Sequence, residues 1–328
     1  MKLPEFNYIA PHSLTEACSI LEEMGGKALP LAGGTDLMLH LKERLKLPKY
    51  LVDLRGIPGL DGISYDHEQG LLLGSLVTLR HLAAAPVVKG NYPVLAQAAL
   101  EVATAQIQAM GTVGGNICQD CLCLYYNKSA VSNNGLERCL KAGGDVCHTV
   151  KGSKKCWATF CSDLAPVFLA LGAKIKIADR EGERTMPLAD LYSGDGRRPL
   201  TLRPGQLLTH IIVPPQVQPS GAVYLKLRVR KSIDYPALGV AVSIRPADGG
   251  RKVAVALTGV EKKPLLIEQD IPEGQKIRDE EIDSLAEQAY AHAHPLNNLR
   301  DFTPTYRKEM VRIYVRSATQ QALRLTGQ

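Results

Sequence analysis

The distribution of cysteine constrains this chain more than any other feature of its sequence. Seven of its eight cysteines fall between residues 118 and 161, and no hydrophobic repeat is sustained from Asp120 to Lys155. A structureless loop of that length is uncommon inside a compact domain, so something other than an apolar core must order it. The chain starts without the apolar run of an export signal, so we expect a cytoplasmic protein. In that reducing compartment, clustered thiols indicate a metal site rather than disulfides.

Periodic segments surround this stretch. Ser13 and Glu16 form a capping box for a helix that Gly25 and Gly26 end. A proline-rich stretch at about 214–220 predicts a boundary between two domains. Beyond it, strands precede helices, which is typical of an α+β domain. We expect helices at about 13–24, 93–109, 280–293 and 304–325, and strands at about 28–32, 51–54, 71–74, 173–178, 207–213, 222–230, 237–244 and 252–258.

Composition limits the classes of partner. The net charge of +6 is a mild bias over 328 residues, and only 5% of the residues are aromatic. We therefore expect no nucleic-acid partner. No apolar run approaches the roughly 18 residues of a membrane span, so we expect no membrane partner either. Neither a GxGxxG fingerprint nor a Walker A motif occurs, which argues against a standard dinucleotide fold and against a nucleoside triphosphatase.

Two glycine turns are candidates for binding phosphate. One runs Pro30-Leu31-Ala32-Gly33-Gly34-Thr35-Asp36-Leu37 and the other runs Thr112-Val113-Gly114-Gly115-Asn116. Glycine lets successive backbone N–H groups approach an anion closely. Either turn alone is equally consistent with an ordinary tight turn. Two of them, ~75 residues apart, indicate a site that holds a pyrophosphate from both sides.

Together with Ser162-Asp163-Leu164-Ala165-Pro166, these turns resemble the FAD-binding subunits of the molybdenum hydroxylases, the family of xanthine dehydrogenase and CO dehydrogenase. The resemblance extends over nearly the whole chain. It implies an α+β fold with an FAD-binding domain of two α+β subdomains over residues 1–216. A cysteine-rich insertion would lie within it at about 119–158. A smaller C-terminal α+β domain, an antiparallel sheet plus helices, would follow over 217–328.

The resemblance also implies how FAD is held. Both glycine turns would wrap its pyrophosphate, Val102 would lie near the flavin, and Leu208 would pack on the cofactor. Asp163 would bind the adenosine side, and Lys226 would lie near the isoalloxazine. From the sequence alone, Asp163 is equally consistent with a cap of the helix that follows it. Lys226 lies on the polar face of the strand expected at 222–230 and is equally consistent with a solvated lysine.

The insertion is similar to that of one branch of the family, the beta subunits of 4-hydroxybenzoyl-CoA reductases, in which it binds a [4Fe–4S] cluster. The matching ligands are Cys123, Cys139, Cys147 and Cys156. Four thiolates suffice for such a cluster, and their ligation would replace burial in ordering the loop. By spacing alone, the alternative is a structural zinc site of the four thiolates, which His148 could join. Cys118 is expected to be a packed residue, and Cys121 and Cys161 have no ligand role in this pattern.

The branch implies an oxidoreductase subunit that has no catalytic residues for the substrate. Electrons would pass from ferredoxin through the cluster and FAD to two [2Fe–2S] clusters of a small partner. A large partner with a molybdenum cofactor would remove the ring hydroxyl of 4-hydroxybenzoyl-CoA, in anaerobic aromatic degradation. The assembly would be a dimer of heterotrimers, and Lys151, Lys154 and Lys155 would receive the acidic ferredoxin. The alternatives are a flavin subunit of another molybdenum hydroxylase with outward electron flow, and a zinc-stabilised binding protein without flavin.

Overall fold

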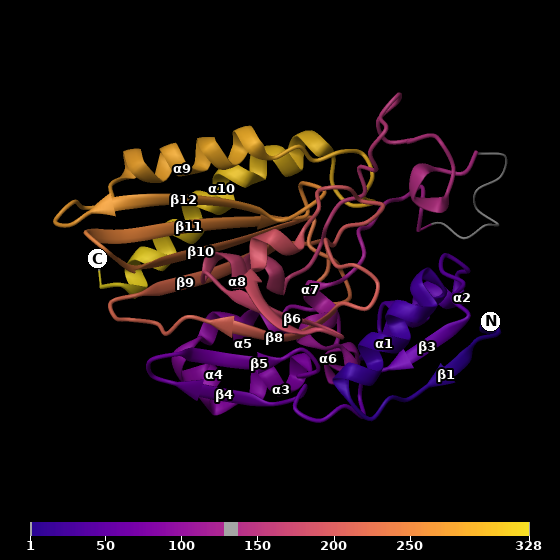
Figure 1. The fold of residues 1–328 in the computed structure, drawn as a ribbon. Coiled ribbons are helices and arrows are strands. Elements are labelled where there is room, and N and C mark those ends of the chain that lie inside the picture. The colour runs from indigo at the N-terminus through magenta and orange to yellow at the C-terminus, as the bar shows by residue number, and fades with distance from the viewer. Residues whose placement is uncertain (1, 128–136, 328) are drawn as a thin grey trace.

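The computed structural model of the chain describes residues 2–127 and 137–327. Within these residues the fold is built on three β-sheets with helices packed on them (Figure 1). Two of the sheets belong to the N-terminal part of the chain, and the third is antiparallel and lies at the C-terminal end. This is the α+β arrangement predicted from the sequence.

The first subdomain is a small parallel sheet in the strand order β1-β3-β2. The predicted helix near the N-terminus is confirmed, because the Ser13 hydroxyl accepts a hydrogen bond from the Glu16 amide at 3.2 Å. Its apolar face packs Ala17, Cys18 and Leu21 into the core. The elements are β1 (Asn7–Ile9), α1 (Leu14–Met24), η1 (Gly25–Lys27), β2 (Ala28–Leu31), α2 (Leu37–Lys42) and β3 (Tyr50–Asp53).

The second subdomain is a five-stranded sheet in the order β4-β5-β8-β6-β7, and all of its neighbouring strands are antiparallel. Its strands are β4 (Ile63–Asp66), β5 (Gly70–Gly74), β6 (Lys174–Asp179), β7 (Gly182–Pro187) and β8 (Leu207–Val213). Its helical elements are α3 (Leu79–Ala84), α4 (Pro86–Asn91), α5 (Pro93–Leu100), α6 (Ala105–Met110), α7 (Val113–Ile117), α8 (Leu164–Ala170) and η4 (Leu188–Leu191). The insertion separates β5 and its helices from α8 and the remaining strands.

The single helix expected at 93–109 is wrong, because the chain forms two helices, α5 and α6, at that place. Ala103 between them adopts a left-handed conformation with φ of 43°, which α-helical backbone does not allow. The Thr104 hydroxyl then caps α6 by accepting a hydrogen bond from the Ile107 amide at 3.3 Å. The break places Val102, Ala103 and Thr104 in the wall of the cavity described below.

The C-terminal domain is an antiparallel sheet in the order β12-β11-β10-β9, with two helices on one face (Figure 1). The opposite face carries small residues, among them Ala241, Ala254 and Ala256, which let α8 of the second subdomain pack closely. The strands alternate in the expected way, since neighbours such as Val240 and Val242 face the domain's own helices. The elements are β9 (Gly221–Leu227), β10 (Leu238–Ala247), β11 (Gly250–Thr258), β12 (Leu265–Pro272), α9 (Asp279–His292) and α10 (Pro304–Leu325).

The described part of the insertion is mostly irregular, as predicted, with one short 3₁₀ helix, η3 (Leu140–Ala142). An isolated bridge between Leu122 and Thr159 closes its base. Residues 128–136 of the insertion lie outside the described residues. No helix in the described ranges combines the length and apolarity that crossing a bilayer requires.

Candidate functional site

Both glycine turns line one large cavity. It encloses about 2030 Å³ of empty space, its open mouth included. Fourteen of the seventeen residues proposed to bind the cofactor line it, namely Pro30, Ala32, Gly33, Gly34, Thr35, Asp36, Leu37, Val102, Thr112, Gly114, Gly115, Asn116, Asp163 and Leu208. The structure therefore brings together segments that are far apart in the sequence, as a cofactor with a long, extended shape requires.

Three of the proposed residues do not line this large cavity. Leu31 and Val113 point into the protein interior and are at most 9% exposed. Lys226 is also absent from the wall of the cavity, and an ion pair described below holds its side chain. The two apolar residues thus hold the turns in place, while the neighbouring glycines face the cavity.

The two turns approach each other so closely that side chains have no room. A Cβ atom on Gly33 would lie 1.9 Å from the carbonyl oxygen of Met110, just ahead of the second turn. A Cβ atom on Gly114 would lie 2.7 Å from that of Ser75. Glycine is therefore required by packing at both positions, and backbone rather than side chains forms this part of the wall. Such a wall suits a diphosphate, which backbone N–H groups can bind.

Asn116 connects the second turn to the helix α8. Its side-chain oxygen accepts hydrogen bonds from the Ser162 hydroxyl at 2.8 Å and from the Leu164 amide at 3.1 Å. The Ser162 hydroxyl in turn accepts one from the Ala165 amide at 2.9 Å. These two residues cap α8, and the Asp163 side chain makes no capping bond. Asp163 occupies the N-cap position of α8, but the interpretation that its side chain caps the helix is wrong.

Asp163 is instead bonded to strand β9. Its carboxylate accepts a hydrogen bond from the Tyr224 hydroxyl at 2.7 Å and lies 2.9 Å from the Lys226 ammonium. Burial raises the pKa of Asp163, and the Lys226 charge and the Tyr224 hydrogen bond oppose that rise. The Lys226 side chain is only 2% exposed, so the interpretation as a solvated lysine is also wrong. Its strand does have a polar face, but the FAD-binding domain covers that face.

Sequence reasoning did not assign a role to several polar residues of the cavity wall. They are His40, Lys46, Gln119, Asp120, Asp234 and Tyr235. Asp120 follows the second turn at the start of the insertion, which is the only local signal that points to it. Lys46 and Asp234 carry no motif, because their position in the wall depends on long-range folding.

The four proposed metal ligands line a second, smaller space, which we call the cysteine cavity. It encloses about 260 Å³ of empty space, and its wall contains Cys123, Cys139, Cys147 and Cys156 together with Tyr125, Tyr126, Leu140, Lys141, His148, Thr149, Trp157 and Ala158. All four thiols are free. Across the described ranges, no three His, Cys, Asp or Glu side chains are close enough to hold one metal ion. The four cysteines thus line one space, but their side chains are not close enough together to bind a single metal ion.

Burial affects the protonation of two of these thiols. It raises the pKa of Cys156 to about 11, and it also raises the pKa of Cys123. Such thiols stay protonated near neutral pH unless a metal takes up the thiolate. Cys118 lines the large cavity instead. Cys121 and Cys161 are buried outside both cavity walls.

Comparison with known proteins agrees with this geometry. The family model described as the FAD binding domain in molybdopterin dehydrogenase matches residues 4–216. The aldehyde oxidoreductase FAD-binding subunit PaoB of Escherichia coli (strain K12) is 33% identical over 88% of this chain and 91% of that protein. The carbon monoxide dehydrogenase medium chain of Afipia carboxidovorans is 29% identical over 97% of this chain and 96% of that protein.

The fold comparison gives the same answer. A chain in the crystal structure of the Cu,Mo-CO dehydrogenase in its cyanide-inactivated form superposes with a TM-score of 0.78 and 26% sequence identity. The superposition covers 99% of this chain and all of the other. Since the family model matches well over half of the residues and the relatives match almost end to end, this chain belongs to the family of FAD-binding subunits of the molybdenum hydroxylases, of the CO dehydrogenase and aldehyde oxidoreductase type.

Proposed function

We propose that this chain is the FAD- and [4Fe–4S]-carrying electron-transfer subunit of a molybdenum-dependent enzyme of the 4-hydroxybenzoyl-CoA reductase type. One observation carries the proposal beyond the family. Cys123, Cys139, Cys147 and Cys156 come from separate parts of the insertion, and all four line one cavity.

The residues present fit FAD. The backbone of Gly33, Gly34, Gly114 and Gly115 would hold the diphosphate between the two turns. The apolar side chains of Val102 and Leu208 would contact the ring systems, and Asp163 would accept a hydrogen bond from the adenosine ribose. Lys226 would hold the Asp163 carboxylate in position for this bond, because the two side chains are paired. When bound, FAD supplies the ability to accept and release one or two electrons.

The cysteine cavity fits an iron–sulfur cluster better than zinc. A structural zinc ion draws four ligands to about 2.0–2.3 Å from one centre. No such convergence occurs among the described residues. A cubane cluster is larger and separates its four thiolates further, while still requiring that they face one space. Tyr125, Tyr126 and Trp157 complete the wall and would shield a bound cluster from water.

The partners and the direction of electron flow follow from the same proposal. Reduced ferredoxin would dock on the exposed Lys151, Lys154 and Lys155 of the insertion. Electrons would leave through FAD to a small subunit with two [2Fe–2S] clusters, and then to a large subunit with the molybdenum cofactor. Within the cytoplasm, a dimer of heterotrimers would remove the aromatic hydroxyl in anaerobic metabolism.

A second candidate is a flavin subunit through which electrons flow outward from a substrate. The likeness to the aldehyde oxidoreductase subunit of Escherichia coli favours this alternative. Both candidates require FAD, and they differ in which partner the chain reduces. Rapid mixing of the assembled enzyme with reduced ferredoxin separates them, since only the first candidate requires fast flavin reduction by that donor.

Metal and flavin analysis of anaerobically purified chain tests the cluster. We expect about four irons with matching sulfide and one FAD per chain. Cys139→Ser should lower the iron content and leave FAD in place, because Cys139 does not line the large cavity. Cys161→Ser is the matched control, since Cys161 lies outside the cysteine cavity. One zinc and no iron in the unaltered chain would exclude the cluster, and equal iron loss in both variants would exclude this ligand set.

A further inference from the structure

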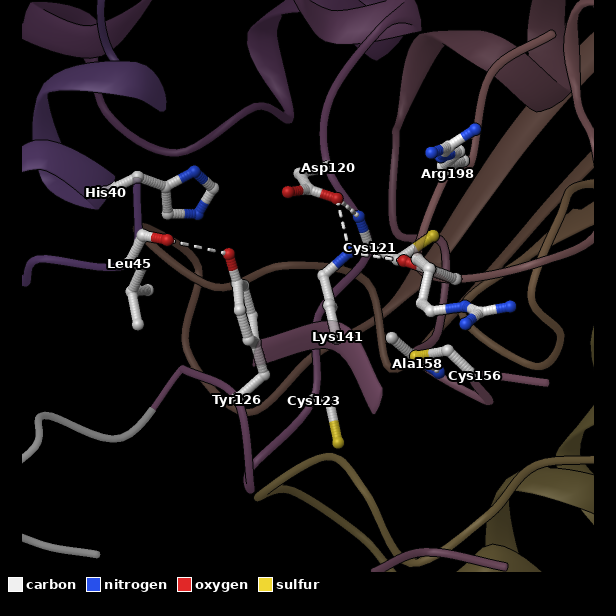
Figure 2. Close-up of polar contacts among 12 residues, drawn as sticks. His40, Leu45, Asp120, Cys121, Cys123, Tyr126, Lys141, Cys156, Ala158 and Arg198 are labelled. Atoms are coloured by element: carbon white, nitrogen blue, oxygen red, sulfur yellow. Dashed lines mark hydrogen bonds and ion pairs between the residues drawn. The ribbon is translucent and has the colours of Figure 1, made fainter. Parts of the chain in front are cut away.

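A chain of three paired charges connects the walls of the two cavities. Figure 2 shows the pair of Asp120 and Lys141. Asp120 and Lys46 line the large cavity, and Lys141 lines the cysteine cavity. The Asp120 carboxylate lies 2.9 Å from the Lys46 ammonium and 2.6 Å from the Lys141 ammonium. We call these three residues the ion triad.

Lys141 extends the ion triad around the cysteine cavity. Its side chain is only 4% exposed, and its ammonium also donates a hydrogen bond to the carbonyl oxygen of Gly196. The Gly196 amide in turn donates to the Cys156 carbonyl at 3.0 Å. Lys141 follows Cys139 by two positions. One buried ammonium therefore connects the segments that carry two of the four cysteines.

An aromatic contact runs beside the ion triad and joins the same two walls (Figure 2). The Lys141 ammonium lies over the ring of Tyr126, 5.1 Å from its centroid. That ring meets His40 edge-on, with 6.4 Å between the centroids. His40 lines the large cavity, whereas Tyr126 lines the cysteine cavity. A second set of contacts, which shares Lys141 with the ion triad, thus links the walls.

The charges make this link costly to break. Asp120 is ionised between two ammonium groups, so the ion triad carries one net positive charge. Without Asp120, the buried Lys141 ammonium would lose its counter-ion, and a buried charge without a partner is strongly unfavourable. A displacement of the wall on either side would separate these charges. Opening of either cavity at this link would therefore have to break a buried ion pair.

We propose that the ion triad couples the two cavities, with Asp120 as the positioning residue, so that a flavin nucleotide bound in the large cavity slows opening of the cysteine insertion. This inference rests on the proposed binding of FAD. Coupling between two sites is reciprocal, so filling the cysteine cavity would tighten FAD binding by the same factor.

Hydrogen exchange on the full chain, with and without saturating FAD, tests the coupling. We expect FAD to slow exchange of the amides from Cys139 to Thr149 by about tenfold, within the range usual for coupled sites. The amides of residues 33–36, in the first turn, report binding itself. Slower exchange in the turn with unchanged exchange in the insertion would overturn the inference and leave FAD binding intact. Unchanged exchange at both places would instead overturn the proposed function.

Variants separate coupling from simple stabilisation. In Asp120→Asn and in Lys141→Met, FAD should still slow exchange in the first turn but no longer in the insertion. If these residues only stabilise the insertion, each variant would exchange faster both with and without FAD, and the ratio of the two exchange rates would stay as in the unaltered chain. That result would count against the proposal. Arg138→Gln is the control, because it removes an exposed charge of the same insertion and should leave the ratio of the exchange rates with and without FAD unchanged. If Asp120→Asn fails to fold, Lys141→Met and the unaltered chain decide the outcome.

Discussion

The Lys226 ammonium lies 2.9 Å from the Asp163 carboxylate, at the contact between strand β9 of the C-terminal domain and helix α8 of the FAD-binding domain. It also donates a hydrogen bond to the backbone carbonyl of Glu101 at 2.8 Å, beside Val102 in the wall of the large cavity. One lysine thus joins strand β9 to two segments that line the cavity. Its effect on bound FAD would pass through the positions of Asp163 and Val102.

Replacing Lys226 should destabilise the chain strongly. Lys226→Met keeps the length of the side chain but leaves the Asp163 carboxylate buried without its counter-charge. Breaking a buried pair in this way costs about 3–5 kcal/mol. Chemical denaturation should show this loss in the free energy of unfolding. Lys231→Met, which removes an exposed charge of the same domain, should change that free energy little, and equal stability of the two variants would contradict the assignment.

Adding one methyl group at Gly33 should prevent FAD from being retained. The new Cβ atom would overlap the Met110 carbonyl oxygen, only 1.9 Å away, so the two turns would have to separate. We expect Gly33→Ala to lower the FAD content of the purified chain severalfold. Gly26→Ala is the control, since nothing lies within 4 Å of a Cβ atom at that position. Full flavin content in Gly33→Ala would show that the close approach of the turns is not needed.

The glycine turns could be predicted from the sequence because their signal is local. A short backbone segment next to an anion requires glycine, whatever the rest of the chain does. The alternation in β9 likewise predicted that Lys226 lies on the polar face of its strand. Alternation does not say what covers that face. In this fold, α8 and its flanking residues cover it. A pattern along the chain therefore gives the direction of a side chain but not its surroundings.

Other features left no local signal. The break between α5 and α6 contains neither glycine nor proline, although Ala103 adopts a left-handed conformation there. The ion triad joins Lys46, Asp120 and Lys141 from three separate segments. Its members look like ordinary charged residues in the sequence, because a long-range ion pair has no spacing rule.

Asn298 of the C-terminal domain should control how firmly the insertion is held. Its backbone carbonyl accepts a hydrogen bond from the Leu124 amide at 2.8 Å, and its side chain bonds to the Trp157 carbonyl at 2.6 Å and to the Thr159 hydroxyl at 3.0 Å. Asn298→Ala would leave buried polar groups without partners, at a cost of about 1–3 kcal/mol. Limited trypsin digestion should then cut the insertion faster. The neighbouring Asn297 is exposed, and Asn297→Ala should not change the rate of cleavage, so similar rates in both variants would contradict this role.

The pH dependence of stability should report the ion triad directly. Burial alone would raise the pKa of Asp120, but the charges and hydrogen bonds of Lys141 and Lys46 outweigh it and lower the pKa to about 2, from 3.8 in the unfolded chain. Because the folded state binds the proton less tightly, Asp120 contributes its stabilisation above about pH 4 and loses it as the pH falls toward 2. A shift of this size corresponds to about 2 kcal/mol.

Urea unfolding at pH 6 and pH 3 tests this contribution. The free energy of unfolding should fall less between the two pH values in Asp120→Asn than in the unaltered chain. Asp270→Asn removes an exposed carboxylate and should follow the unaltered chain. Other acidic groups, such as Asp53, titrate in all three proteins and cancel in the comparison. An equal loss in all three would mean that the two lysines do not hold the Asp120 charge in the folded state.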